Sequence, residues 1–359
     1  MLFRSTTDHP QAIAPDLLPV LAASGLKPLQ LAGRQLLPIV QGGMGVGVSA
    51  HRLAGSVAAA GDVNGDGLGD LVIGASHANA ASGVSAGRSY VMFGTTATSP
   101  QGLSALAAGT GGFVINGQCA YDASGSSVAG AGDVNGDGLG DLLVGAPYAD
   151  PSGLGNAGRT YVVFGKAAGA SVDLQVVATG VGGFVINGES AGGRSGTQVA
   201  GAGDVNGDGY ADLLIAGASS GPAYVVFGKS GTASVSLSSV SAGTGGFVIR
   251  GAVTSVAAAG DINGDGLADL LVGSANSYGP AGGNSGRSYV VFGTSSTTGV
   301  DLSTVATGLG GFVINGESAG DLSGKAVVSA GDVNGDGLAD LIVGAPGAQV
   351  AAGIAGRAT

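Results

Sequence analysis

Aspartate and asparagine side chains recur at fixed spacing in five nine-residue segments of this chain. In each segment, oxygen-bearing side chains occupy positions 1, 3, 5 and 9, glycine occupies positions 4 and 6, and leucine or tyrosine occupies position 7. Ca²⁺ prefers several oxygen ligands, and alternate positions of a tight loop can direct their oxygens to one point. Glycine permits the backbone angles that such a loop requires. The pattern therefore predicts five calcium-binding loops, with the backbone carbonyl of position 7 as one ligand.

The predicted metal ligands are the residues at positions 1, 3, 5, 7 and 9 of each loop. In chain order they are Asp62, Asn64, Asp66, Leu68 and Asp70; Asp133, Asn135, Asp137, Leu139 and Asp141; Asp204, Asn206, Asp208, Tyr210 and Asp212; Asp261, Asn263, Asp265, Leu267 and Asp269; and Asp332, Asn334, Asp336, Leu338 and Asp340. An EF-hand would need glutamate at position 12 and flanking helices, but position 12 is always isoleucine or valine here. Simple Asn-Gly or Asp-Gly hairpin turns are the alternative, but they do not require aspartate at position 9 in all five copies.

These loops lie in register with a long internal repeat. The first aspartates of successive loops are 71, 71, 57 and 71 residues apart. The second unit has four strand patterns, at residues 127–131, 141–145, 158–165 and 183–188. A long period with four short strands is typical of a β-propeller blade. The sequence therefore predicts an all-β propeller with four complete four-stranded blades and a partial fifth, in which the third unit is shortened.

Two further strings accompany the loops. Phe-Gly occurs at residues 93–94, 164–165, 227–228 and 292–293, and Gly-Ala-Pro occurs at residues 145–147 and 344–346. Over about 300 residues the chain therefore resembles FG-GAP repeats, the blades of the integrin α-subunit propeller and of many bacterial surface proteins. The resemblance implies structural Ca²⁺ between the first two strands of a blade and a ligand on the opposite face. Integrin propellers have seven blades, and this chain ends where the third strand of the fifth would begin, so we interpret it as a fragment of a longer array in preference to a small, imperfectly closed ring.

Residues 1–53 stand outside the repeat, which we assign to residues 54–359. The segment from about Leu26 to Ala59 resembles the start of nitronate monooxygenases, which are flavin-dependent TIM-barrel enzymes. That resemblance would place Gln41, Gly42, Gly43 and Met44 near FMN. It covers only about a tenth of the chain, and one strand cannot close an eight-stranded barrel. We interpret the segment as a fusion, a recombined reading frame or an assembly artefact, and not as an independent domain.

The composition of the chain excludes several classes of function. The net charge is −11, the loops hold 15 of the 24 acidic residues, and five Ca²⁺ ions would bring the charge to about −1. Lysine and arginine are too few for a nucleic-acid partner, and no apolar run is long enough to span a membrane. The single cysteine, Cys119, forms no intramolecular disulfide, and no signal peptide is visible at the amino terminus. The expected need for millimolar Ca²⁺ nevertheless favours an extracellular or cell-surface location.

We therefore expect a calcium-binding module for adhesion to a protein or glycan ligand, without enzymatic activity. His77 and Cys119 occur in one unit each and are expected to be isolated surface residues, whereas the equivalent Glu189 and Glu317 indicate a role in a turn. The aromatic candidates for ligand contact in the long connections are Tyr121, Tyr148 and Tyr278, although each could equally pack against its own blade. Two alternatives are open: a remnant of a flavin-dependent oxidoreductase, and a chimeric fragment without function.

Overall fold

The computed structural model describes residues 29–31, 34–36, 56–96, 102–167, 169–218, 220–350, 353–354 and 357–358. The chain divides into two compact units, Met1–Gly42 and Gly43–Thr359. In the first unit, β1 (Leu29–Leu31) and β2 (Arg34–Leu36) pair as an antiparallel hairpin. The predicted boundary between residues 53 and 54 and the flavin-like residues 41–44 lie outside the described residues, so both stay predictions.

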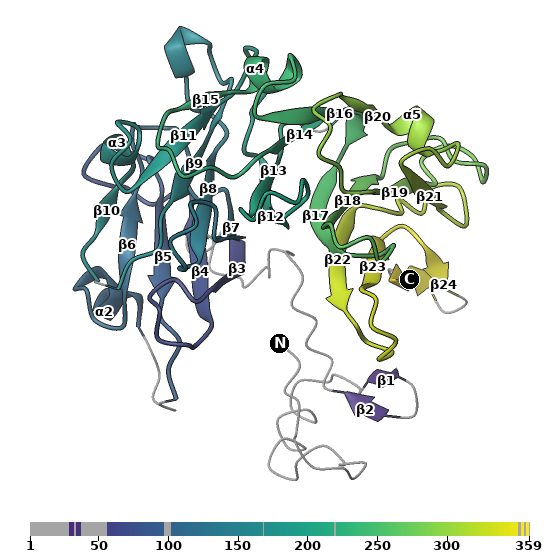
Figure 1. The fold of residues 1–359 in the computed structure, drawn as a ribbon, viewed down its shortest axis with the longest axis horizontal. Coiled ribbons are helices and arrows are strands. Elements are labelled where there is room, and N and C mark those ends of the chain that lie inside the picture. Colours follow the sequence, from purple (N-terminus) through teal and green to yellow (C-terminus); the bar gives the residue numbers. More distant parts are fainter. Residues whose placement is uncertain are drawn as a thin grey trace. The chain divides into compact units, whose positions relative to one another are not determined.

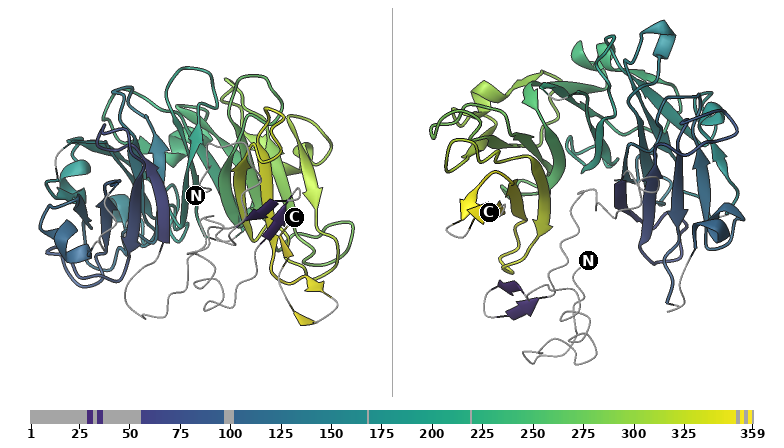
Figure 2. Two further views of the ribbon diagram at one scale, coloured as in Figure 1. Left: turned by 90° about the horizontal axis from the view of Figure 1, so that it is seen from below. Right: turned by 180° about the vertical axis from the view of Figure 1, so that it is seen from behind.

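Five antiparallel sheets follow one another along the second unit (Figures 1 and 2). The first blade contains β3 (Ser56–Gly61), β4 (Asp70–Ala75), β5 (Arg88–Met92) and β6 (Gly112–Asn116). The second contains β7 (Ser127–Gly132), β8 (Asp141–Ala146), β9 (Arg159–Val163) and β11 (Gly183–Asn187). The third contains β12 (Gln198–Gly203), β13 (Asp212–Ala216), β14 (Gly221–Val226) and β16 (Gly246–Val253). In each blade the predicted metal loop joins the first and second strands.

The last two blades differ in completeness. The fourth contains β17 (Ser255–Gly260), β18 (Asp269–Ser274), β19 (Arg287–Val291) and β21 (Gly311–Asn315). In the fifth, β22 (Ala326–Gly331) pairs with β23 (Asp340–Ala345), and β23 pairs with the two-residue strand β26 (Arg357–Ala358). A small hairpin of β24 (Gln349–Val350) and β25 (Gly353–Ile354) precedes β26. The all-β fold with four complete blades and a partial fifth is as predicted.

The third blade is the compact one, as its sequence predicted. Its second and third strands are joined by residues 217–220 alone, and β16 extends to Val253, so that only Thr254 separates it from β17. These two shorter connections, before β14 and after β16, together account for the 57-residue spacing between this blade's metal loop and the next.

Blades pack face to face through apolar side chains that alternate along each strand. We call the side of a blade toward the preceding blade its leading face and the other side its trailing face. In the second blade, Leu142 and Tyr161 belong to the leading face, whereas Leu143 and Phe184 belong to the trailing face, and all four are fully buried. The first strands β3, β7, β12, β17 and β22 each adjoin the next in that order. The core is therefore a series of layers between blades.

Neighbouring blades are also tied by a hydrogen bond at the end of the fourth strand. The hydroxyl of Tyr224 on β14 donates to Glu189 Oε1, which follows β11 of the preceding blade, at 2.7 Å. The hydroxyl of Tyr161 on β9 donates to Gln118 Oε1, after β6, in the same way at 2.5 Å. These two buried tyrosines thus have polar partners from the preceding blade.

A short helix occupies the connection before the fourth strand of each complete blade, and in three of these connections an exchanged strand is described just before the helix. The sequence predicted neither feature. The helices are α2 (Leu103–Ala107), α3 (Leu174–Val177), α4 (Leu237–Ser241) and α5 (Leu302–Val305). Just before the last three lie β10 (Val172–Asp173), β15 (Val235–Ser236) and β20 (Val300–Asp301). Each of these strands pairs in parallel with the fourth strand of the preceding blade, giving that sheet a fifth strand.

The Gly-Ala-Pro string marks a place where two backbones touch. A Cβ atom added to Gly145 would lie 2.1 Å from the carbonyl oxygen of Gly196, in the connection that leads to the third blade's first strand. Only glycine fits this approach, which explains the glycine of the string.

We expect Gly145→Ala to destabilise the fold by about 1–3 kcal/mol, since backbone must move to admit the methyl group. Gly155→Ala, where nothing lies within 4 Å of the added atom, is the matched control and should change stability little. Thermal melts followed by far-UV circular dichroism compare the two variants. Equal melting temperatures for both would contradict the tight approach at Gly145.

Candidate functional site

The five predicted metal loops have one conformation, built on their own aspartates. In the second loop, Asp133 Oδ1 accepts hydrogen bonds from the N–H groups of Gly136 at 2.7 Å and Asp137 at 3.1 Å, and Asp133 Oδ2 accepts from Gly138 at 2.8 Å. Asn135 Oδ1 accepts from the Asp137 N–H at 2.8 Å, and Asp137 Oδ1 accepts from the Leu139 N–H at 2.9 Å. The other four loops repeat these bonds with their own residues.

The aspartate at position 9 connects each loop to the Phe-Gly string. Asp141 Oδ2 accepts from the N–H of Val134 at 2.9 Å, and its Oδ1 accepts from the N–H of Gly165 at 2.8 Å. Asp70, Asp212 and Asp269 do the same with the glycine after their own phenylalanine. The backbone N–H of the Phe-Gly glycine thus holds the position-9 carboxylate in place, a role that the sequence alone did not indicate.

Four of these position-9 carboxylates are almost completely buried, and Asp340 of the fifth loop is half-buried. Burial raises the pKa of Asp141 and of Asp212 to about 7, and it also raises the pKa of Asp70 and Asp269. Backbone N–H groups lower these pKa values, whereas the neighbouring position-5 carboxylate raises each of them again. These four carboxyl groups therefore hold their protons more tightly than an exposed aspartate does.

The donor set of each loop fits Ca²⁺ in kind, with three carboxylates, one amide oxygen and one backbone carbonyl; a bidentate carboxylate or a water would bring these five groups to the six to eight oxygens that Ca²⁺ takes. In the part of the chain that the structure describes, however, no three aspartate, glutamate, histidine or cysteine side chains converge closely enough to hold a metal ion. The reason is that the position-1 carboxylates are turned onto backbone N–H groups of their own loops. The twenty-five predicted ligands all lie in the loops, and their role in binding calcium stays a prediction.

At the ends of the strands opposite to the metal loops lies a group of exposed residues, all apolar or aromatic except one arginine, which we call the aromatic patch. Its members are Val84, Tyr121, Tyr148, Leu154 and Arg194, from connections of the first and second blades. The exposed fractions of Tyr121 and Tyr148 are 69% and 43%, and those of Val84 and Leu154 are 53% and 39%. Since antiparallel strands alternate in direction, these connections emerge at the end opposite to the metal loops.

Backbone hydrogen bonds hold the aromatic patch together. The Tyr121 N–H donates to the Val84 carbonyl at 2.9 Å, and the Tyr148 N–H donates to the Asp122 carbonyl at 3.4 Å. The Arg194 guanidinium lies over the Tyr148 ring, 5.2 Å from its centre. Tyr121 and Arg194 have φ values of 67° and 49°, a left-handed backbone that is strained for residues with a side chain. Tyr278 is 77% exposed on the fourth blade, so all three predicted tyrosines are exposed.

Asp122 lies beneath the aromatic patch and is only 7% exposed. Burial raises its pKa to about 6, the nearby Arg159 guanidinium lowers the pKa, and Asp150 raises it. Because the folded protein holds this proton more tightly than the unfolded chain, the stability contribution is complete below pH 4 and is lost as the pH rises through 6.

We therefore expect the stability of the protein to fall by up to ~3 kcal/mol between pH 4 and pH 6 because of Asp122. Asp122→Asn should remove that part of the pH dependence, since asparagine does not ionise. The difference between the melting temperatures of the two proteins, measured across this range, isolates the effect from that of the other carboxylates. Parallel pH profiles for the wild type and Asp122→Asn would contradict it.

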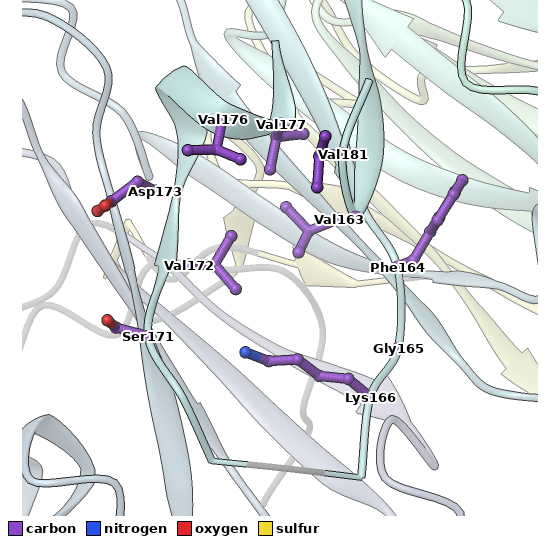
Figure 3. A pocket seen from close by; sticks show the side chains of 11 residues that line it. Val163, Phe164, Gly165, Lys166, Ser171, Val172, Asp173, Val176, Val177 and Val181 are labelled. Carbon is purple, nitrogen blue, oxygen red and sulfur yellow. The ribbon is translucent and has the colours of Figure 1, made fainter. Parts of the chain in front are cut away.

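A pocket of about 310 Å³ lies beside α3 (Figure 3). Valines at 163, 172, 176, 177 and 181 line it, and Lys166 and Asp173 are its charged residues. The Lys166 ammonium lies 4.3 Å from the centre of the Phe113 ring and donates to the Ala170 carbonyl, and burial lowers its pKa. Asp173 accepts from Asn116 Nδ2 at 3.0 Å. The lining brings together no nucleophile with a base, and its charged groups have structural partners.

The remaining candidates are surface residues, as predicted. Cys119 is exposed, and His77 is exposed with its Nδ1 3.1 Å from the Ser76 hydroxyl. His9 and His51 lie outside the described residues. Among the helices that the structure describes, none has the length and apolar character needed to cross a bilayer.

Comparison with known proteins identifies the repeat. The family model of the FG-GAP repeat matches residues 54–92, 124–163 and 326–359, and that of the FG-GAP-like repeat matches residues 204–272. Curated relatives include integrin alpha-IIb of Mus musculus, 33% identical over 159 residues, and integrin alpha-4 of Xenopus laevis, 33% identical over 149 residues. Another is the phosphatidylinositol-glycan-specific phospholipase D of Bos taurus, 34% identical over 162 residues.

Each match covers only part of this chain and only part of the relative. They cover 43%, 40% and 42% of this chain and 14%, 14% and 18% of the respective relatives. The shared part is the repeat, and the chain spans less than a fifth of the relatives' length.

Proposed function

The chain is built from FG-GAP repeats, as parts of the integrin alpha subunits are, and on that premise we propose that it is a calcium-stabilised β-propeller that binds a protein or glycan at the cell surface. In this proposal the metal loops give rigidity, and the aromatic patch at the opposite ends of the strands contacts the ligand. The molecule acts by binding and carries out no chemical step.

Calcium binding is supported by the donor set and the charge of the loops. Every loop offers the same five oxygen donors, and the carboxylates at positions 1, 5 and 9 repel one another until a cation neutralises them. The side chains at positions 3 and 5, such as Asn135 and Asp137, are partly or fully exposed and are held only within the loop. They can turn toward an incoming ion without disturbing the core.

The cell-surface location follows from the same proposal. Calcium sites of extracellular modules bind with dissociation constants of roughly 0.1–1 mM. Such sites would be filled outside a cell and nearly empty at cytosolic calcium concentrations, so the repeat would have its full stability only outside. The integrin names of the relatives agree with a surface role.

The aromatic patch is the single observation that carries the binding role. It has two exposed tyrosines on neighbouring connections, one of them stacked with an arginine. Tyrosine and arginine are enriched at the centres of interfaces, where such side chains contribute most binding energy. Two patch residues keep a strained backbone, and such strain is retained where a site requires a fixed geometry.

Immobilised extracellular-matrix proteins and a glycan array, probed with the purified protein in Ca²⁺, test the proposal. Tyr121→Ser and Tyr148→Ser should each weaken the binding to a responding component by roughly tenfold or more. Tyr278→Ser, which removes an equally exposed tyrosine from the fourth blade, is the matched control and should bind as the wild type does. If nothing on either panel binds, or if all three variants bind equally, the binding role of the aromatic patch is wrong.

A further inference from the structure

The apolar side chains on the leading face of the first blade are more exposed than their equivalents on the leading face of the second blade. Four apolar side chains on β4 and β5 are half-buried, although their equivalents in the second blade are completely or almost completely buried against the blade before them. The half-buried set is Leu71, Ile73, Tyr90 and Met92, and the equivalent set is Leu142, Val144, Tyr161 and Val163. The first blade therefore presents a surface of the kind that elsewhere in this chain is an interface.

Among the residues that the structure describes, none covers the trailing face of the fifth blade either. Val333 is 42% exposed, whereas its equivalents Val63, Val134 and Val205 are fully buried. Ile342 on β23 is half-buried, whereas Leu143 at the same place in the second blade is fully buried. Exposed apolar surface of this kind is typical of an interaction site.

The polar backbone groups of the two faces are complementary too. At three of the four contacts between successive blades, the N–H at position 8 of one metal loop donates to the carbonyl at position 1 of the preceding loop: Gly140 to Asp62 at 2.7 Å, Ala211 to Asp133 at 2.9 Å and Ala268 to Asp204 at 2.9 Å. Between the fourth and fifth blades, the described residues Ala339 and Asp261 do not form this bond. In the described residues, the N–H of Gly69 on the first blade and the carbonyl of Asp332 on the fifth have no such partner. A blade that followed the fifth would offer the donor that Asp332 lacks.

We propose that these two faces bind each other between copies of this chain, so that the fifth blade of one copy docks head to tail on the first blade of the next. The contact would repeat the interface that joins β3 to β7 and β7 to β12 within one chain. Ile73 of one copy would pack near Ile342 and Val333 of the other, and Gly69 would donate to Asp332.

The expected association is weak and open-ended. The fifth blade has only β22, β23 and the short β26 among the described residues, so the contact is confined to the inner strands and its area is at the low end of specific interfaces. Because the two faces differ, the contact is heterologous, and it leads to chains or rings of copies and not to a twofold dimer. An equivalent repeat on another protein would fit the same faces, and a second copy is the source that this sequence itself supplies.

Sedimentation velocity of the full chain across the micromolar range, in Ca²⁺, tests the proposal. The wild type should form dimers and larger species as the concentration rises. Ile73→Asp and Ile342→Asp should each weaken association by at least about tenfold, because either places a charge in the contact. Leu309→Asp, at a side chain that is 69% exposed on the fourth blade, is the matched control and should associate as the wild type does.

Mixing the two variants gives the decisive result. Each retains one intact face, so an equimolar mixture of Ile73→Asp and Ile342→Asp should form a dimer and nothing larger, and this rescue also shows that both variants are folded. A wild type that stays monomeric throughout, as it would if the two faces met within one chain, overturns the proposal. Loss of association in only one of the variants, or a mixture that stays monomeric, overturns the head-to-tail arrangement.

Discussion

We expect millimolar Ca²⁺ to raise the melting temperature of the EDTA-treated protein by about 11 °C. If each loop binds with a dissociation constant of roughly 100 μM, ~1 mM Ca²⁺ stabilises the fold by about 1.4 kcal/mol per site. Five independent sites then contribute about 7 kcal/mol, which is comparable with the ~5–15 kcal/mol net stability of a whole domain. An unfolding entropy of about 0.6 kcal/mol/K for some 300 residues converts this into the stated shift. Circular dichroism melts in EDTA and in Ca²⁺ measure it.

Two controls make this result specific. Mg²⁺ at the same concentration should raise the melting temperature little, because it demands a smaller octahedral site and gives up water reluctantly. Asp137→Ala and Asp336→Ala should each remove one bound ion in calorimetric titrations, and the remaining sites should still bind. Identical melts in EDTA and Ca²⁺ would show that the loops are turns without a metal, which is the alternative that the sequence leaves open.

The second large effect is expected from a phenylalanine in the interface between blades. Phe184 is fully buried, pairs edge-to-face with Phe164 at 6.2 Å between ring centres, and has the Lys229 ammonium 4.4 Å from its ring centre. Phe184→Ala should therefore cost about 3–5 kcal/mol, through lost burial and the cavity left behind. By the same conversion, the melting temperature should fall by about 5–8 °C.

Phe312 provides a matched control at the equivalent position of the fourth blade. It pairs with Phe292 at the same 6.2 Å, but its exposed fraction is 38%. Phe312→Ala should therefore cost only about 1 kcal/mol, because little new cavity is created. Equal losses in the two variants would mean that the face around Phe312 is covered in solution, and comparison at several protein concentrations would then show whether a second copy covers it.

Much of the fold could be predicted because its signals are local. The loop pattern fixes where each first strand ends and each second strand begins, and the alternating Val, Leu and Ile residues mark the strands themselves. For example, the pattern predicted a strand at 141–145, and β8 spans Asp141–Ala146. The blade count followed from repetition alone.

The short helices were missed although a signal is present. Leucine is followed three residues later by leucine or valine at 103 and 106, 174 and 177, 237 and 240, and 302 and 305. That spacing places both side chains on one side of a helical turn, but helices of four or five residues give too short a pattern to stand out from a loop. Their inward side chains at Leu106, Val177, Val240 and Val305 are all buried.

Contacts between residues far apart in the chain could not be predicted from the sequence. The equivalence of Glu189 and Glu317 suggested a turn, but the structure shows that Glu189 accepts from Tyr224 and Ser241 of the next blade, each at 2.7 Å. The aromatic patch likewise could not be predicted, because the order and direction of the strands decide which connections lie at the same end of the sheets. Tyr121 and Tyr148 could be singled out by type, whereas the stacking of Arg194 on Tyr148 could not.

The exchanged strands β10, β15 and β20 couple the local unfolding of one blade to that of its neighbour. Each belongs to one blade by sequence and to the preceding sheet by pairing, so a blade that opens takes the outermost strand of its neighbour with it. Local opening is therefore expected to spread from the fourth and fifth sheets, which have no exchanged strand in the described part of the chain, toward the interior. Amide hydrogen exchange would then record a gradient, fastest in β21 and β23 and slowest in β8 and β9, and not five equal units.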